Sequence, residues 1–102
     1  MISKEYYTHF INKHCCDDRF VRMAQALGMK DAGDPKDFIT ALVKLQEDCG
    51  VADLKMSDYG IMHDECMTLA QNARATMGGL FGCDPIPLSD EECAAIFEKS
   101  YR

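Results

Sequence analysis

The sequence predicts an all-α fold of about five helices packed as a compact bundle. Apolar residues recur at spacings of three and four in five separate stretches, and most of these stretches are bounded by helix start or stop signals. No segment alternates apolar and polar residues over five positions, and no Asn-Gly or Asp-Gly hairpin turn occurs. We therefore expect residues 1–102 to form a single helical domain or subdomain without strands.

The first two helices are predicted before residue 28. Residues 3–14 carry one broad apolar stripe, formed by Tyr6, Tyr7, Phe10 and Ile11. The second helix follows Asp17 or Asp18, because either carboxylate can cap its N-terminus. It ends near Leu27, since Gly28 supplies the left-handed stop that terminates many helices.

The third helix is predicted after a polar loop at residues 30–36. Asp34 offers a capping oxygen, and Pro35 is expected at the first helical position, where its missing N–H is not needed. One apolar face follows, marked by Phe38, Leu42, Leu45 and Cys49, and Gly50 ends the helix. Residues 51–62 form a connector that is expected to pack on the core through Leu54, Met56, Tyr59 and Ile61.

The last two helices are predicted on either side of a loop. Residues 63–77 carry a helical stripe of Cys66, Leu69, Ala70, Ala73 and Met77. Residues 78–87 are predicted to be a loop, because a glycine-rich run followed by two prolines does not continue a helix. Ser89 and Glu92 have the spacing of a capping box, which predicts a fifth helix that runs to about Tyr101.

Composition and charge exclude several classes of protein. Seventeen acidic and eleven basic residues give a net charge of −6, which repels a phosphate backbone, so nucleic acid is not an expected partner. No apolar run approaches the roughly 18 residues that a bilayer span needs, and no membrane association is expected. The first residues also lack the features of a secretory signal. We therefore expect a soluble, cytoplasmic protein whose six cysteines are reduced and mostly packed in the core.

Motifs for metal binding or nucleophilic catalysis are not found in this chain. His9, His14, Cys15 and Cys16 lie within eight residues, but the two histidines are five positions apart. On a helix they would point about 140° apart, whereas paired helical ligands are four positions apart. The two aspartates that follow Cys16 would raise rather than lower the pKa of a neighbouring thiol. No catalytic, metal-binding or cofactor-binding residue is predicted.

The glycine-rich run at residues 78–82 allows two interpretations. Phosphate-binding loops follow a strand and open a helix, whereas this run follows a predicted helix, so it is expected to be a helix stop and tight connector. The alternative is a mobile apolar wall of a substrate cleft, because an exposed Leu80-Phe81 pair lies among the glycines.

Six features occur along the chain in a distinctive order. They are Arg19–Gly28, Phe38–Leu45, Asp48–Leu54 with Tyr59–Ile61, the predicted helix His63–Met77, Asp84–Leu88, and a closing helix that ends in Lys99–Tyr101. This order resembles the C-terminal end of the iron-containing (group III) alcohol dehydrogenases over nearly the whole chain. Two positions depart from that family, which usually has proline where Ala52 stands and an Asn-Pro-Arg type of turn where Asp84-Pro85-Ile86 stands.

The resemblance implies a two-part parent enzyme, an NAD(P)-dependent alcohol dehydrogenase. Its N-terminal α/β domain binds NAD(P), and its helical domain supplies one aspartate and three histidines that hold Fe²⁺ or Zn²⁺. The metal acts there as a Lewis acid on the alcohol oxygen while hydride passes to nicotinamide. The last ligand belongs to a His-Gly motif upstream of Met1, and none of His9, His14 or His63 matches a ligand position.

The chain is accordingly expected to be a tail subdomain, a fragment of the parent that is inactive alone. Gly79, Leu80 and Phe81 are the residues that the resemblance brings to the wall of the substrate cleft. The expected partner is the N-terminal nucleotide-binding and metal-binding portion of the parent, and an apolar surface left uncovered would favour self-association.

Two other hypotheses are compatible with the sequence. The first is a stand-alone helical protein-interaction module, whose surface would be well covered except for one apolar groove. The second is a thiol-based or metal-sensing small protein that uses Cys15 and Cys16, which would need an abnormally reactive thiol.

Overall fold

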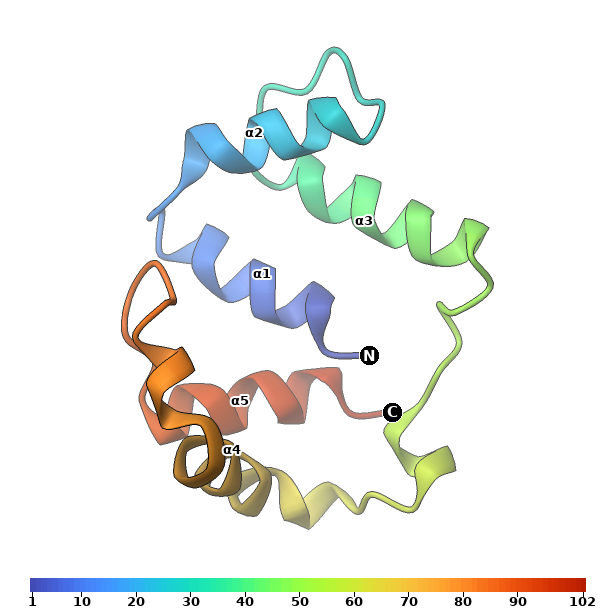
Figure 1. The fold of residues 1–102 in the computed structure, drawn as a ribbon. Helices are drawn as coiled ribbons and strands as arrows, with labels where there is room; N and C mark the ends of the chain where they lie inside the picture. Colours follow the sequence, from blue (N-terminus) through green and yellow to red (C-terminus); the bar gives the residue numbers. More distant parts are fainter.

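The computed structural model describes residues 1–102 and confirms the predicted all-α class (Figure 1). Its α-helices are α1 (Ser3–Asn12), α2 (Asp17–Ala26), α3 (Asp37–Asp48), α4 (Cys66–Phe81) and α5 (Asp90–Ser100). Two short 3-10 helices, η1 (Met56–Tyr59) and η2 (His63–Glu65), lie between α3 and α4. None of the helices combines the length and the apolar character that a membrane span requires.

The central helix is α1, which packs against α3 on one side and α5 on the other (Figure 1). Its buried residues Phe10 and Ile11 join Phe20 of α2 and Phe38 of α3 in the first core cluster. The ring of Tyr7 meets the rings of Phe20 and Phe38 edge to face, at centroid distances of 6.1 and 5.1 Å. The apolar stripe predicted for residues 3–14 therefore forms the centre of the fold.

A second, smaller cluster holds α4 against α5. It consists of Ala70 on α4 and of Cys93 and Ala94 on α5. Phe81, the last residue of α4, packs against this cluster and also against the first one. The end of α4 is thus the place where the two clusters are joined.

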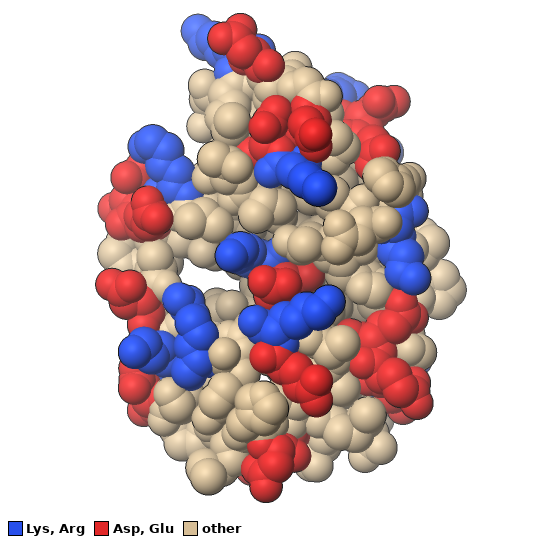
Figure 2. Space-filling model, turned by 180° about the vertical axis from the view of Figure 1, so that it is seen from behind, with Lys and Arg blue, Asp and Glu red and all other residues tan.

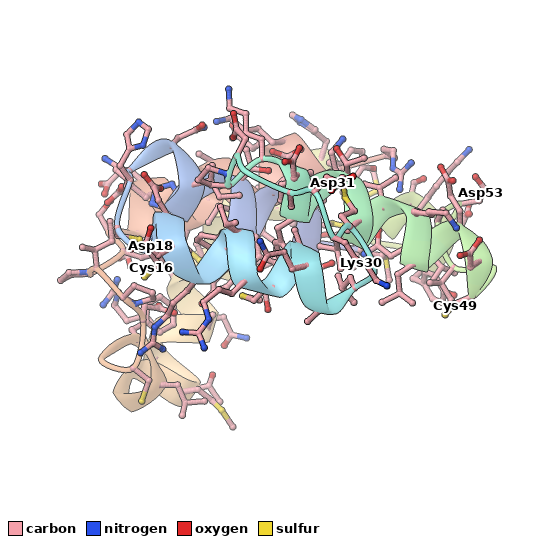
Figure 3. The ribbon with its side chains drawn as sticks, turned by 90° about the horizontal axis from the view of Figure 1, so that it is seen from above. Cys16, Asp18, Lys30, Asp31, Cys49 and Asp53 are labelled. Carbon is pink, nitrogen blue, oxygen red and sulfur yellow. The ribbon has the colours of Figure 1, made fainter.

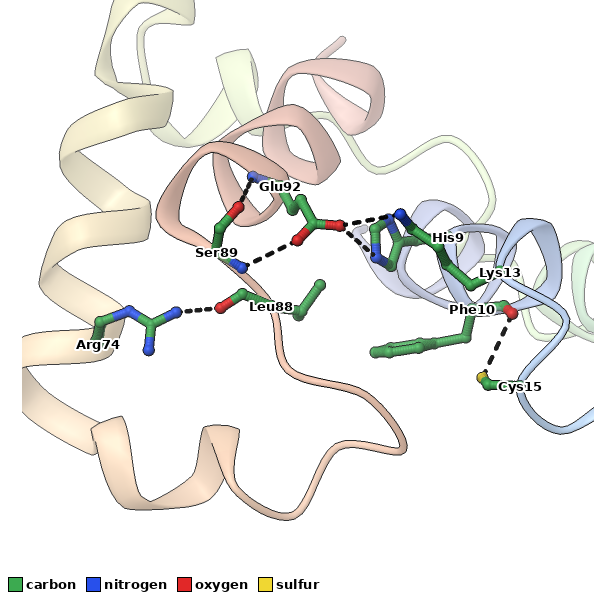
Figure 4. Close-up of polar contacts among 8 residues, drawn as sticks. All are labelled: His9, Phe10, Lys13, Cys15, Arg74, Leu88, Ser89 and Glu92. Carbon is green, nitrogen blue, oxygen red and sulfur yellow. Dashed lines mark hydrogen bonds and ion pairs between the residues drawn. The ribbon is translucent and has the colours of Figure 1, made fainter.

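Several predicted helix ends are confirmed. Gly28 and Gly50 follow α2 and α3 with φ angles of +106° and +72°, a left-handed conformation that glycine adopts without steric cost. The capping box at the start of α5 is complete (Figure 4). The Glu92 amide donates to Ser89 Oγ at 3.1 Å, and the Ser89 amide donates to a Glu92 carboxylate oxygen at 3.2 Å.

The prediction that residues 78–87 form a loop is wrong for residues 78–81. After a kink at Met77, whose φ and ψ are −135° and 34°, α4 continues through Gly78 and Gly79 to Phe81. A glycine inside a helix costs up to about 1 kcal/mol relative to alanine. The packing of Phe81 against both core clusters offsets this cost. Residues 82–87 lie outside the helices, as predicted.

The start of α3 also differs from the prediction. The helix begins at Asp37, so Pro35 lies in the preceding turn and not at the first helical position. Asp34 caps that turn, because its Oδ1 accepts from the Lys36 amide at 2.8 Å. The Asp37 carboxylate accepts from the amides of Gly33 and Asp34 at 3.1 and 3.2 Å, which satisfies the loop before the helix.

The predicted apolar face of α3 is buried only near the start of the helix. Phe38 is buried, whereas Leu45 is 44% exposed and Cys49 is exposed. The six cysteines are free, with Cys66 and Cys93 buried, Cys15 and Cys16 half-buried, and Cys49 and Cys83 exposed. The prediction of a core position is therefore wrong for Cys49, which lies at the opposite end of the molecule from Cys16 (Figure 3).

The connector packs on the core through Met56, as predicted, but Tyr59 is exposed and takes no part in that packing. The C-terminal residues hold the connector in place. The amide and Oγ of Ser57 donate to the Arg102 carbonyl at 3.1 and 2.8 Å, and the Tyr101 hydroxyl donates to another connector carbonyl at 3.1 Å.

The folded chain exposes more surface than its mass predicts. Its accessible surface is 6720 Å², whereas a folded monomer of 11.5 kDa exposes about 5,800 Å². Its radius of gyration is 14.5 Å, against about 13 Å for a compact domain of this length. The large apolar side chains that are exposed are Met1, Ile2, Met23, Leu27, Leu45, Val51, Tyr59, Met62, Met67, Met77 and Leu80. The surface excess of about 900 Å² is comparable with the roughly 800 Å² that one partner contributes to a standard protein interface.

Candidate substrate-cleft wall

Residues 78–87, which we call the wall segment, lie between the kink in α4 and the cap of α5. Leu80 is 60% exposed and Gly79 is exposed, whereas Phe81 is half-buried against the two core clusters. The structure thus separates the three predicted wall residues. Leu80 can contact another molecule from the surface, and Phe81 anchors the segment that carries it. The role of the three residues in a substrate cleft stays a prediction.

Arg74 holds the end of α4 against the start of α5. Its guanidinium lies over the Phe81 ring, 4.5 Å from the centroid. It donates to the Leu88 carbonyl (Figure 4). It also donates to Asp90 Oδ1 at 2.5 Å. One side chain therefore contacts the chain on both sides of residues 82–87, since Phe81 precedes these residues and Leu88 follows them.

A second contact ties the wall segment to α1. The Tyr6 hydroxyl donates to Asp84 Oδ1, across 78 positions of sequence and in a partly buried place. Burial and then the hydrogen bond to Asp84 raise the pKa of Tyr6 far above its ordinary value. Tyr6 consequently remains protonated, and it stays a hydrogen-bond donor well into the alkaline range.

A small charged cluster joins α1 to the capping box of α5 (Figure 4). Glu92 Oε2 lies 3.3 Å from His9 Nε2 and 3.6 Å from Lys13 Nζ. The His9 contact has the distance of an ion pair but not the alignment of a hydrogen bond. The pKa of Glu92 is lowered, chiefly because its carboxylate accepts a hydrogen bond from the Ser89 amide. The Ser89 side chain and the positive charge of Lys13 lower it further. Glu92 thus serves helix capping and helix packing together.

Glu92→Gln is expected to remove part of the acid sensitivity of folding. Because the folded-state pKa of Glu92 is depressed, its contribution is present above the ordinary glutamate pKa of about 4.3 and is lost as pH falls through the folded value. Urea unfolding between about pH 7 and pH 3 measures this. Glu91→Gln is the matched control, since the neighbouring carboxylate makes none of these contacts. Identical pH profiles for Glu92→Gln and the wild type would contradict the prediction.

The histidines and thiols near the end of α1 do not assemble into a reactive site. His14 Nδ1 lies 3.2 Å from Asp17 on the surface, and the Cys15 thiol donates to the Phe10 carbonyl at 3.5 Å (Figure 4). Burial and the neighbouring Cys16 thiol raise the pKa of Cys15. A raised pKa keeps a thiol protonated and unreactive at neutral pH. This is the opposite of what the thiol-based hypothesis needs.

No group of three or more His, Cys, Asp or Glu side chains is placed to hold a metal ion. The resemblance implies iron or zinc ligands upstream of Met1, and no chemical step is assigned to a metal bound by this chain. Charges of both signs alternate over the face shown in Figure 2, so this face offers no basic stripe for a phosphate backbone.

Sequence reasoning missed a cavity of about 330 Å³ between the chain ends and the connector. An opening is visible in the face of the molecule shown in Figure 2. The cavity is lined by both charge signs, including Lys4 and Glu5 of α1, Glu47 of α3 and Lys99 of α5. These residues come from separate helices, so no local sequence pattern marks the cavity.

The fold and the wall segment define an all-helical protein with several large apolar side chains exposed and no cluster of His, Cys, Asp or Glu placed to hold a metal ion. A scan against models of known protein families, a search of curated proteins and a search of solved structures each found no match. Functional inference for this chain accordingly comes from its own residues and geometry and from the resemblance of its sequence features.

Proposed function

We propose that this chain is the C-terminal helical subdomain of an iron-containing alcohol dehydrogenase, which interconverts primary alcohols and aldehydes with NAD(P). The observation that carries the proposal is the surface excess of about 900 Å² over a folded monomer of the same mass. A tail subdomain covered by the rest of its enzyme exposes such a surface when it stands alone. The order of the six sequence features and the all-α fold give further support.

The proposal divides the work between this chain and the rest of the enzyme. The upstream portion binds the metal and NAD(P), which together supply the hydride chemistry. This chain supplies a helical support and, through the exposed Leu80 side chain, an apolar contact for the carbon chain of the alcohol. The location is cytoplasmic, because six free cysteines persist in a reducing compartment.

The first experiment uses the purified 102-residue chain. We expect no stoichiometric iron or zinc, no alcohol-dependent reduction of NAD(P), and self-association that increases with protein concentration in sedimentation experiments. Tight binding of one metal equivalent together with alcohol oxidation would overturn the proposal. A monomer with a sharp, concentration-independent melt would instead favour the stand-alone interaction module.

The second experiment grafts the chain onto a known enzyme. Residues 1–102 replace the corresponding tail of an iron-containing alcohol dehydrogenase, and the same enzyme without a tail is the control. The chimera is expected to oxidise a primary alcohol, whereas the control is expected to be inactive. In the chimera, Leu80→Ala is expected to raise KM for longer primary alcohols by about threefold to tenfold. The kcat is expected to change little, because the lost apolar contact stabilises the bound substrate and the transition state equally.

A further inference from the structure

The wall segment is attached to the fold in an unequal way. At its start lie the non-helical Met77 and two glycines, and a Cβ added at Gly79 would meet no atom within 4 Å. Phe81 then anchors this end of the segment to both core clusters. Between the Phe81 anchor and buried Leu88, the Tyr6–Asp84 contact is the one side-chain hydrogen bond that leaves the segment.

The Tyr6 side chain is held firmly on the α1 side of this contact. Its ring packs edge to face against Tyr7 and Phe10, with centroid distances of 5.2 and 5.0 Å, so its hydroxyl is aimed by the first core cluster. Asp84, a loop residue, accepts the hydrogen bond from the Tyr6 hydroxyl. Its own amide donates to the Phe81 carbonyl at 3.4 Å. A rigid donor thus holds an acceptor in residues 82–87, which also pack on the first core cluster through Ile86.

We infer that Tyr6 is a positioning residue for the wall: its hydrogen bond to Asp84 latches residues 82–87 onto α1, and loss of the bond lets these residues move between the Phe81 anchor and Leu88. The latch is a property of the isolated fold. Its meaning for a substrate cleft, where it would hold the loop that follows Leu80 and Phe81, rests on the proposed function.

The test is amide hydrogen exchange of the 102-residue chain carrying Tyr6→Phe. The Cys83 and Asp84 amides donate within the wall segment, to the carbonyls of Leu80 and Phe81. They are expected to exchange about tenfold faster in the variant, because a hydrogen bond to a charged acceptor is lost. Amides of α2, which lie away from the segment, are expected to keep their wild-type rates.

Two further variants make the test specific. Tyr7→Phe is the matched control, since the Tyr7 hydroxyl makes no hydrogen bond while its ring packs in the same cluster, and it is expected to leave the segment unchanged. Asp84→Asn is expected to reproduce Tyr6→Phe, and combining the two is expected to add nothing further.

Unchanged exchange in Tyr6→Phe, or an equal acceleration at all amides, would overturn the latch. The outcome is independent of dehydrogenase activity. An active chimera with no latch would leave the proposed function intact, and a latch in a chain whose chimera is inactive would leave the positioning role intact.

Discussion

Phe10→Ala is expected to lower the free energy of unfolding by about 3–5 kcal/mol. Phe10 is 1% exposed and is one of the two largest fully buried side chains. It sits in the first core cluster between α1, α2, α3 and α5, so its removal opens a cavity at the centre of the fold. With only 14 buried residues in the chain, few side chains are available to fill that cavity. Urea unfolding followed by far-UV circular dichroism, at one fixed protein concentration, measures the loss.

Leu80→Ala is the control for this substitution. Leu80 is 60% exposed, so its truncation is expected to change the free energy of unfolding by no more than about 0.5 kcal/mol. The contrast separates burial from hydrophobicity, because both substitutions remove a large apolar side chain. A loss below about 1 kcal/mol for Phe10→Ala would mean that the first cluster is not the centre of stability.

Arg74→Ala is expected to lower the free energy of unfolding by about 2 kcal/mol, the second-largest effect. The substitution removes the donor to the Leu88 carbonyl, which lies in the chain segment leading into α5, and the cation over Phe81. The ion pair with Asp90 adds little, because both side chains are more than a third exposed.

Arg74→Lys is expected to recover less than half of this loss. An ammonium group cannot donate to the Leu88 carbonyl and to Asp90 with the forked geometry of a guanidinium. Arg19→Ala, an exposed substitution on α2, controls for the general loss of an arginine from a helix and is expected to be nearly neutral. Thermal or urea unfolding at high salt separates the ion pair from the other contacts. If Arg74→Lys were as stable as the wild type, the prediction would be wrong, because a positive charge without the forked guanidinium geometry would then account for the whole contribution of Arg74.

Short-range signals account for most of the fold that could be predicted. The left-handed glycines after α2 and α3 and the Ser89–Glu92 capping box are decided within four residues, and the structure has each of them. The miss at residues 78–81 has a tertiary cause. Two glycines weaken a helix locally, but at the end of the continued helix Phe81 packs against both core clusters. No local pattern contains that information.

The candidate site was predictable only in part, because its geometry also depends on tertiary contacts. The Leu80-Phe81 pair was visible as two apolar residues among glycines, but their different fates depend on contacts with α1, α4 and α5. The Tyr6–Asp84 contact joins residues 78 positions apart, and the Arg74 contacts span 14 and 16. Long-range pairs of this kind follow from packing, which one sequence does not display.

The placement of α1 against α5 has a consequence for the synthesis of the protein. The ribosome makes α1 about 80 residues before it makes α5, yet buried residues of both helices share the first core cluster. At about 5–20 residues per second, roughly 4–16 seconds separate the two events. During that time the apolar stripe of α1 lacks its last covering helix. Completion of the core is therefore delayed until α5 has been synthesised, and the apolar stripe of α1 is less covered for that interval.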